Sequence, residues 1–368
     1  MRVAFYAPLK SPDHPVPSGD RRIARLFLDA LRLAGHDPFV VSRLRSYDGE
    51  GDLERQQRLA AIGRHMVERM LRRWRRNPED KPQLWLTYHL YYKAPDWLGP
   101  AVSNALGIPY AVAEASFAPK RAGGAWAPGH HAIAAALSQA AAVLGLNPAD
   151  RAGVLPLLAD ASRWVPLSPF LDATDYPALP EHRAGPPRLI AVAMMRPGDK
   201  LASYRLLGVA LALLLDLPWS LDIIGDGPAR PEVEAAFAPL GERVRYLGER
   251  DDSGVGAALS AADLFVWPAV NEAFGMALLE AQACGLPVIA GASGGVAGVV
   301  AHDTTGLLVA PGDADAFAAA ARRLILDLAL RERMGAAARE KVRREHDLPQ
   351  AAARLAAVIE RLGRKRAA

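Results

Sequence analysis

The feature that most constrains the fold is a regular alternation of short apolar segments with longer amphipathic ones. Residues 2–8, RVAFYAP, are rich in β-branched and aromatic side chains and predict a strand. Residues 20–36 carry apolar side chains at helical spacing, with Gly35 near the end, which predicts a helix. Another strand is predicted at 38–42. Strand, helix and strand at this spacing predict a parallel sheet with right-handed crossovers.

The alternation occurs twice along the 368 residues, on either side of an irregular stretch, 165–188, that holds six prolines. The sequence therefore predicts an α/β protein with two doubly wound, Rossmann-like domains, at 1–172 and 173–345. A long last helix is expected at 329–362, and its end, 346–368, is predicted to cross back to the first domain. Because ligands of such sheets bind at the carboxyl ends of the strands, facing domains would share a central cleft.

The composition is that of an ordinary globular protein and excludes several classes. Hydrophobic residues make up 51% and charged residues 23%, with a net charge of +4, which does not indicate nucleic-acid binding. The single cysteine, Cys284, permits no intrachain disulfide and fits a reducing cytoplasm. The N-terminus begins as a strand without the apolar region of a signal peptide, and the longest apolar run, 206–215, is too short to span a bilayer. A cytoplasmic location is expected.

The most informative stretch is NEAFGMALLEAQACGLPVIAGASGGV, residues 271–296. It follows a predicted strand, and a helix is predicted at 275–283, so Glu272 lies at the helix N-terminus and Glu280 on the helix. In the simplest interpretation, Glu272 only complements the helix dipole and Glu280 only faces solvent. The helix is apolar nearly all round, however, and a carboxylate in it needs a partner. No histidine lies nearby to support a metal site, whereas sugar or ribose hydroxyls suit a carboxylate.

Cations and glycines follow other predicted strands. Arg196 and Lys200 come after the strand at 188–195, where they could clamp a diphosphate rather than serve as solvated surface. Gly19 precedes the first helix, where backbone could approach a phosphate. The motif at 225–230, GDGPAR, lacks the third glycine of a dinucleotide fingerprint and is read as a turn. The Asp-x-Asp at 313–315 opens a predicted helix and is read as a cap rather than a metal site.

One segment, 58–77, predicts a basic amphipathic helix with six arginines between positions 64 and 76. Two interpretations are open. The helix packs on the first domain with a solvated basic face, or it docks on an anionic membrane that holds a lipid-linked acceptor.

The segment 271–290 resembles the Glu-x7-Glu signature of retaining, GT-B-fold glycosyltransferases, specifically family 4. The resemblance extends over most of 188–330, through LDIIGDGP, VRYLGERDD and GASGGVAGVV, and is looser in the first domain. It implies a metal-independent hexosyltransferase of polysaccharide or glycolipid biosynthesis. Such an enzyme moves sugar from a nucleotide-diphosphate donor to a glycan, lipid or small-molecule hydroxyl, retains the anomeric configuration and needs no cofactor.

The resemblance also implies roles for individual residues. Glu272 would approach the sugar hydroxyls and Glu280 the ribose, while Arg196 and Lys200 would hold the diphosphate. The remaining donor-binding positions are Gly19 and the backbone amides of Ala273, Phe274, Gly275 and Met276.

The chain departs from the family at two positions. Ala115 stands where the family carries a histidine in the first domain, and Gly298 stands where a glutamate is frequent. His89, His130 and His131 are candidates for the missing histidine, and the residues leave the choice open. Alternatives of the same fold are a nucleotide-sugar epimerase or phosphorylase, and Ala115 motivates a third, a catalytically silent nucleotide-sugar binder.

Overall fold

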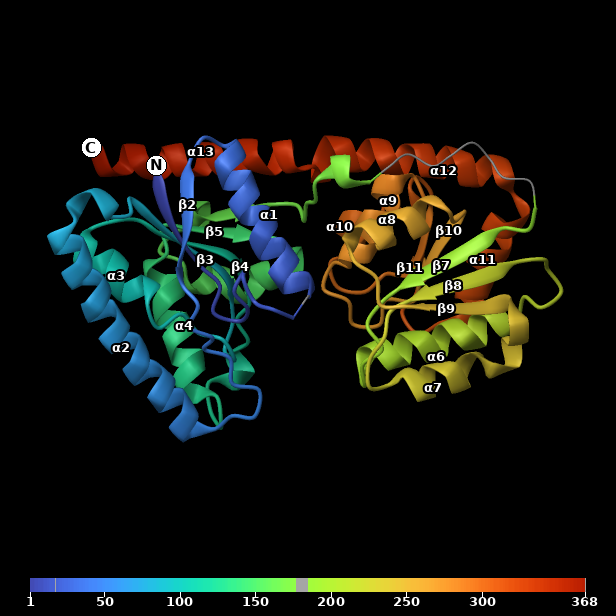
Figure 1. Ribbon diagram of the computed structural model, residues 1–368, viewed down its shortest axis with the longest axis horizontal. Coiled ribbons are helices and arrows are strands. Elements are labelled where there is room, and N and C mark those ends of the chain that lie inside the picture. The colour runs from blue at the N-terminus through green and yellow to red at the C-terminus, as the bar shows by residue number, and fades with distance from the viewer. Residues whose placement is uncertain (17, 177–184, 368) are drawn as a thin grey trace. The chain divides into compact units, whose positions relative to one another are not determined.

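The computed structural model describes residues 1–16, 18–176 and 185–367, and it divides the chain into two compact units. Unit 1 comprises Met1–Ser168 and Leu348–Ala368, and unit 2 comprises Pro169–Asp347. The sequence predicts the corresponding ends at 172 and 345. Part of the predicted irregular stretch, 177–184, lies outside the described residues. Each unit is built on a six-stranded parallel sheet (Figure 1).

The sheet of unit 1 has the order β2-β1-β3-β4-β5-β6. The chain places β2 on one side of β1 and the later strands, from β3 on, on the other side. The β1–β3 pair is therefore the switch point at which ligands of doubly wound sheets bind. The strands are β1 (Arg2–Tyr6), β2 (Asp37–Ser42), β3 (Leu84–Leu90), β4 (Tyr110–Ala115), β5 (Ala142–Gly145) and β6 (Trp164–Pro166).

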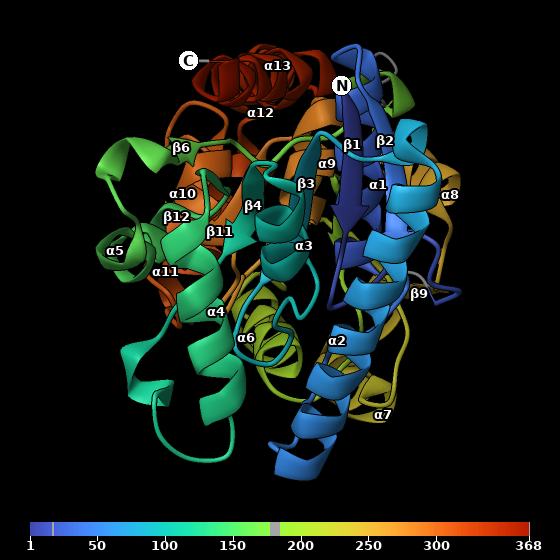
Figure 2. The same ribbon diagram turned by 90° about the vertical axis from the view of Figure 1, so that its left-hand side faces the viewer.

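Helices cover both faces of this sheet. On one face, α1 packs against α13; on the other, α2 contacts α3 and α4 (Figures 1 and 2). The second face buries a core that includes Trp85, Leu98, Val112 and Ile133. The helices are α1 (Gly19–Leu33), α2 (Leu53–Arg76), α3 (Gly99–Leu106), α4 (Ala127–Gln139), α5 (Arg151–Val154) and α13 (Leu348–Ala367).

The sheet of unit 2 has the order β9-β8-β7-β10-β11-β12, which is the 3-2-1-4-5-6 order of a Rossmann fold. Its switch point lies between β7 and β10. The strands are β7 (Arg188–Val192), β8 (Ser220–Ile224), β9 (Val244–Gly248), β10 (Leu264–Trp267), β11 (Val288–Gly291) and β12 (Gly306–Val309).

In unit 2, α6 contacts α7 and α11, while α8 and α12 contact α9. This arrangement places α9 between neighbouring helices and the sheet, and every residue from Leu278 to Cys284 is buried. The helices are α6 (Asp199–Ala212), α7 (Arg230–Phe237), α8 (Asp252–Ser260), α9 (Met276–Cys284), α10 (Val296–Val299), α11 (Ala314–Leu326) and α12 (Leu328–Lys341).

The predicted single helix at 329–362 is wrong. The structure has two helices there, α12 and α13, separated by a π-helical turn at Val342–His346 and an extended Asp347. Pro349 explains the break, because proline has no N–H and its ring clashes with the preceding helical turn. The sequence also missed β6, a strand of only three residues that overlaps the start of the predicted irregular stretch.

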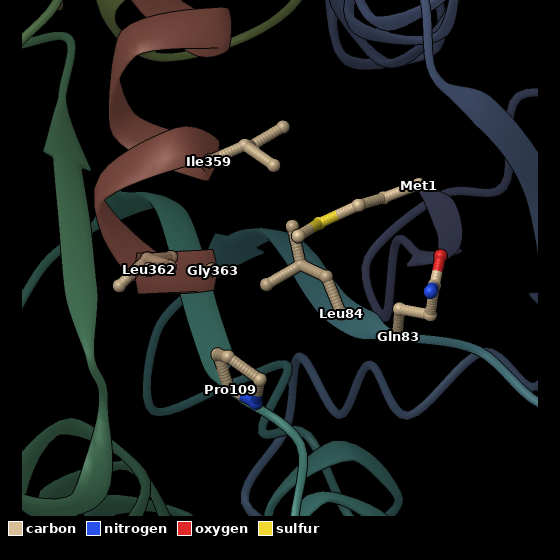
Figure 3. Close-up of a pocket in the computed structure, with 7 residues that line it drawn as sticks. All are labelled: Met1, Gln83, Leu84, Pro109, Ile359, Leu362 and Gly363. Carbon is tan, nitrogen blue, oxygen red and sulfur yellow. The ribbon is translucent and has the colours of Figure 1, made fainter. Parts of the chain in front are cut away.

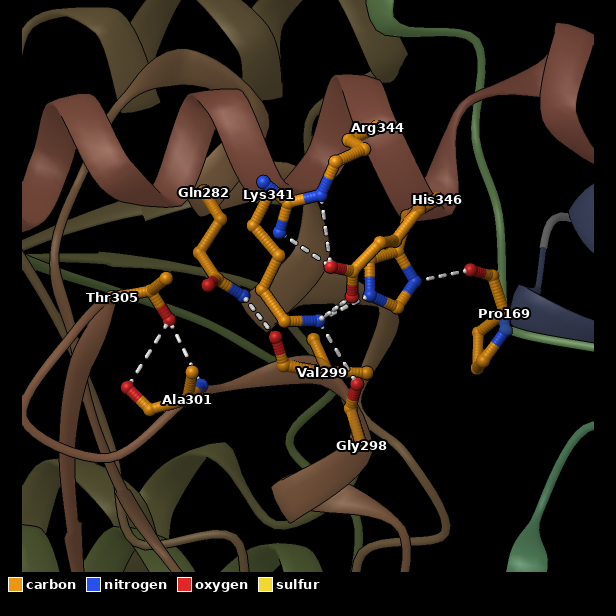
Figure 4. Close-up of polar contacts among 10 residues, drawn as sticks. Pro169, Gln282, Gly298, Val299, Ala301, Thr305, Lys341, Arg344 and His346 are labelled. Carbon is orange, nitrogen blue, oxygen red and sulfur yellow. Dashed lines mark hydrogen bonds and ion pairs between the residues drawn. The ribbon is translucent and has the colours of Figure 1, made fainter.

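The two ends of unit 2 are held together by His346, which is buried (Figure 4). Its Nδ1 donates to the carbonyl of Pro169 at 2.7 Å, and its Nε2 accepts from Lys341 Nζ at 2.7 Å. Lys341 also donates to the carbonyl of Gly298 and pairs with Glu345. Burial and the Lys341 ammonium lower the pKa of His346 to about 4, so the imidazole is neutral at pH 7.

Unit 1 contains a small pocket beside α13 (Figure 3). Met1, Gln83 and Pro109, which come just before β1, β3 and β4, line it together with Ile359 and Leu362. The pocket therefore lies at the amino ends of the strands, at the opposite edge from the switch point. Its lining is mostly apolar and offers no group that could perform catalysis.

Candidate functional site

The loop between β10 and α9 forms the centre of the candidate site. Ala269 and Asn271 adopt positive φ values of 54° and 50°, and Gly275 caps α9 in the left-handed region at φ 71°. A Cβ on Gly275 would lie 2.7 Å from a methyl group of Leu278, so glycine is required there. The helix begins at Met276, one residue after the prediction.

The N-terminus of α9 offers free hydrogen-bond donors. Within the described part of the chain, the backbone N–H groups of Ala273, Phe274, Gly275 and Met276 donate to no protein acceptor. No side chain caps the helix either. Free amides and the positive end of the helix dipole together suit an anion such as a phosphate.

The structure brings Lys200 and Glu272 together across the switch point of unit 2. Lys200 lies in the first turn of α6, after β7, and its Nζ lies 2.5 Å from Glu272 Oε2. Trp267 supports both groups: its Nε1 lies 3.4 Å from the same Oε2, and Lys200 Nζ lies 5.5 Å from its ring centre. The side chains are 29% and 17% exposed, so both remain accessible to a ligand.

Further contacts fix the two segments that carry this pair. Asn271 donates to Asp199 at 2.9 Å, and the backbone N–H of Val270 donates to the buried hydroxyl of Ser203 at 3.0 Å. Asp199 and Ser203 were not predicted from the sequence. Because they are 72 and 67 residues from their partners, only the folded sheet reveals the contacts.

The glycine-rich segment after β11 packs directly on the loop that carries Glu272. Gly294 has φ 52°, and a Cβ there would lie 2.1 Å from the Glu272 carbonyl oxygen. The N–H of Gly295 donates to the Ala273 carbonyl at 2.6 Å. These contacts give GASGG a structural role: it sets the position of Glu272 and of the amides that follow.

The other predicted donor-binding residues lie in three different environments. Arg196 is exposed in the loop after β7, and its guanidinium makes no ion pair with a described residue. Glu280 is only 6% exposed, because the surrounding part of α9 is fully packed. Gly19 is the first residue of α1 and so belongs to unit 1, with open space where a Cβ would point.

The positions considered for the family histidine can now be placed. Ala115 is 2% exposed and belongs to the core of unit 1, whereas the preceding residue, Glu114, has φ 57° and leaves the strand pattern. His130 is buried, with Nε2 against the carbonyl of Ala118, and His131 is exposed. His89 lies near the end of β3, with Nδ1 2.9 Å from Asp20 Oδ1.

The Asp-x-Asp motif at 313–315 and the GDGPAR motif at 225–230 act as a helix cap and as a turn, as the sequence predicts. Asp313 caps α11 by accepting from the N–H of Ala316 at 2.8 Å. In GDGPAR, Gly225 turns the chain at φ 142°, where a Cβ would collide with the Ala193 carbonyl. Among the described residues, no three His, Cys, Asp or Glu side chains cluster closely enough to hold a metal ion.

The basic helix α2 begins earlier than predicted, at Leu53. Its apolar face, which includes Val67 and Trp74, packs into the core of unit 1, and the six arginines between 64 and 76 are exposed. The apolar side is therefore occupied by the protein itself. No described helix is both long enough and apolar enough to cross a membrane.

Solved structures identify the fold of the whole chain. Sucrose-phosphate synthase from Thermosynechococcus elongatus superposes with a TM-score of 0.74 at 20% identity, covering 99% of this chain and all of that one. HepE from Anabaena, solved in complex with UDP and glucose, gives a TM-score of 0.70 at 19% identity and covers 98% of this chain and 99% of its own. The fold is thus the GT-B fold of glycosyltransferases.

Sequence comparison identifies the family of the domain that carries the site. Residues 200–341 match the family model Glycosyl transferases group 1. Sulfoquinovosyl transferase SQD2 of Arabidopsis thaliana is 36% identical over 121 residues, which is 32% of this chain and 23% of that protein. N-acetyl-alpha-D-glucosaminyl L-malate synthase of Bacillus anthracis is 36% identical over 132 residues, 35% of this chain and 34% of that protein. The chain therefore contains a glycosyl transferases group 1 domain, although its matches span only about a third or less of these relatives.

Proposed function

We propose that this chain is a retaining, metal-independent glycosyltransferase that moves a hexose from a nucleoside diphosphate donor to an acceptor hydroxyl. The observation that carries the proposal is the Lys200–Glu272 pair beside the free N-terminus of α9. A cation, free amides and a carboxylate at one switch point match the successive parts of a nucleotide-sugar.

Each group has a distinct role in this reaction. The α9 amides and Lys200, joined by Arg196, stabilise the negative charge that develops on the departing diphosphate. Glu272 orients the sugar hydroxyls, and Glu280 takes the ribose. These fixed cations and amides supply the charge stabilisation that a divalent metal gives in other phosphate chemistry.

The chemical step breaks the bond between the anomeric carbon and the phosphate oxygen. The acceptor oxygen forms its new bond on the same face of the sugar, and its proton passes to the departing phosphate. Because the diphosphate and Glu272 are both anionic partners for Lys200, their ion pair must rearrange as the donor binds. Glu272 is then free to accept hydrogen bonds from the sugar.

The proposal is tested by measuring release of nucleoside diphosphate from a panel of nucleotide-sugars, preceded by a thermal-shift screen for binding. Lys200→Ala and Glu272→Ala are expected to lower kcat/KM by roughly 100-fold to 1,000-fold, as for removal of a transition-state-stabilising group. Arg205→Ala on the same α6 and Glu242→Ala are matched controls at exposed positions.

Full activity in both site variants would exclude this site. Binding of nucleotide-sugar without turnover would instead identify a silent binder. Unchanged turnover after chelation of divalent ions is the expected result for metal independence.

The acceptor in this proposal is a glycan, a lipid or a small molecule, and the name of one relative contains such a small molecule, L-malate. A membrane-bound acceptor would favour contact through the exposed arginines of α2, by charge alone because the apolar face is packed. We expect co-sedimentation with vesicles of anionic lipid to fall when Arg72, Arg73, Arg75 and Arg76 are replaced by alanine. Equal sedimentation of variant and wild type, or no difference between anionic and neutral vesicles, would remove the membrane role.

A further inference from the structure

The Lys200–Glu272 ion pair joins two groups that the proposed function assigns to different parts of the donor. Lys200 Nζ lies 2.5 Å from Glu272 Oε2, and in the part of the chain that the structure describes this oxygen is the only hydrogen-bond acceptor of the ammonium. The two side chains are 29% and 17% exposed, so the pair is partly shielded from water. Shielded charges attract each other more strongly than exposed ones, so breaking this pair costs more than breaking a surface pair.

The surrounding segments hold both members of the pair in place. The indole N–H of Trp267 lies 3.4 Å from the same Glu272 oxygen, and the Lys200 ammonium lies 5.5 Å from the centre of the Trp267 ring. Asn271 donates to Asp199 at 2.9 Å, which ties the residue before Glu272 to the residue before Lys200. A second contact therefore fixes the spacing of the two chain segments. The ion pair can open by rotation of its side chains and close again without a movement of the backbone.

A nucleotide-sugar compensates both members of the pair when it separates them. Its diphosphate takes the Lys200 ammonium, and the hydroxyls of its sugar donate to the Glu272 carboxylate. Each charged group exchanges one hydrogen-bond partner for another, so neither is left without a partner.

A nucleoside diphosphate, which is the product of the transfer, compensates only one member of the pair. It offers anionic oxygens to Lys200, but it has no sugar hydroxyl to donate to Glu272. The carboxylate then loses its cation and lies beside added negative charge. Removing the partner of a partly buried charge is unfavourable. The same ion pair thus opposes binding of the product more than binding of the donor.

We propose that Glu272 competes with the diphosphate for Lys200 once the sugar has been transferred, so that the ion pair re-forms and expels the product. The competition rests on the glycosyltransferase function proposed above. In this cycle Glu272 has two successive partners, the sugar hydroxyls before transfer and Lys200 after it. The competition is specific to Lys200, because Arg196 makes no ion pair with a described residue.

The test is isothermal titration calorimetry of UDP, GDP and ADP with the full chain. Glu272→Gln keeps the shape of the side chain and removes its charge, so it should tighten binding of the nucleoside diphosphate by at least about 10-fold, the loss of one charge-assisted competitor. Glu232→Gln is the matched control, because it makes the same change at an exposed position in the first turn of α7, which follows another strand of the same sheet. An exposed charge is largely screened, so this variant should bind within about 2-fold of wild type.

Lys200→Met separates the competition from simple repulsion between Glu272 and the phosphates. In a double-mutant cycle, Glu272→Gln should tighten binding much less when Lys200 has already been replaced. Equal tightening in both backgrounds, or the same tightening in Glu232→Gln, would reveal repulsion alone and would overturn the proposal. Glu272→Asp is a second variant if Glu272→Gln does not fold. Its shorter side chain weakens the contact with Lys200, so a change in the same direction is expected.

Unchanged or weaker binding of the nucleotides by Glu272→Gln would also overturn the proposal, as would failure of both wild type and this variant to bind any of the three. Turnover of nucleotide-sugars is measured separately. Turnover by wild type without tightening in Glu272→Gln overturns only this inference. Tightening without turnover overturns only the proposed function and leaves Glu272 as a competitor for phosphate at Lys200.

Discussion

The switch points of the two sheets carry opposite chemistry on the same plan. In unit 2, Lys200 and the free amides of α9 present positive charge around one carboxylate, Glu272. In unit 1, Asp20 and Glu114 present carboxyl groups around one cation, His89. A parallel α/β sheet therefore determines where a ligand binds, and the side chains after its strands determine which ligand.

The two switch points also differ in how their geometry is held. The one in unit 2 depends on glycines that permit close backbone approach, such as Gly294 against the Glu272 carbonyl. The one in unit 1 depends on non-glycine residues in left-handed conformations, His89 and Glu114. Adding a methyl group should thus disturb the first, whereas changing charge should disturb the second.

Among the changes that test this comparison, the largest effect is expected from Gly294→Ala. The new Cβ would lie 2.1 Å from the Glu272 carbonyl oxygen at a residue with φ 52°, so the loop that carries Glu272 must shift. A displacement of about 1 Å at a reacting group costs on the order of 100-fold in rate. The measurement is kcat/KM for the nucleotide-sugar found in the binding screen.

Gly298→Ala is the matched control for this change. It lies four residues further along in α10, where an added Cβ meets no atom within 4 Å. Equal activity of the Gly294 and Gly298 variants would contradict the view that close packing sets the unit 2 site.

A smaller effect is expected from replacing His89, and this effect is on stability. Burial opposes the charge on His89, but Glu114 and Asp20 outweigh it and raise the pKa of His89 to about 9 in the folded chain against about 6.5 unfolded. The contribution of His89 is therefore complete below pH 6.5 and is lost as pH rises through 9. The shift corresponds to about 3 kcal/mol as an upper bound. Urea unfolding of wild type should show stability falling between pH 7 and 9.5, and His89→Gln should flatten this fall.

His65→Gln, at an exposed position on α2, should leave the alkaline fall unchanged. An alkaline fall of the same size in the His89 variant would show that the Asp20–His89–Glu114 cluster is not the charged group inferred here.

The smallest effect is expected from replacing His346. This change tests the contrast between His89 in unit 1, whose pKa is raised, and His346 in unit 2, whose pKa is lowered. His346 has its pKa lowered to about 4, so its contribution is present above pH 6.5 and is lost as pH falls toward 4. His346→Gln should lose about 1–2 kcal/mol at pH 7, since it cannot reproduce both ring hydrogen bonds. The variant should also show a shallower loss of stability in urea between pH 6.5 and 4.5. A pH profile parallel to that of wild type would contradict a neutral, buried His346.

Most helices and strands could be predicted from the local pattern of apolar and polar residues. The two errors also have local causes, but the apolar pattern does not reveal them. Apolar runs bounded by turn residues predicted the strands at 2–8, 38–42 and 188–195, which the structure contains as β1, β2 and β7, because buried parallel strands are nearly continuous in hydrophobicity. The three-residue β6 was too short for such a run. The break between α12 and α13 was missed because the helical period continues across it, although Pro349 was the available signal.

By itself, the sequence determined the fold class, the two-fold repetition of the α/β plan and the segment 271–296 as the centre of the candidate site. It could do so because periodicity, capping residues and the Glu-x7-Glu spacing are properties of neighbouring residues. Only the tertiary structure decided that Lys200 meets Glu272, that Gly294 supports their loop, and that Glu114 rather than Ala115 is presented at the edge of unit 1. These contacts join residues from different strands or depend on a backbone flip at a single residue, and neither leaves a period in the sequence.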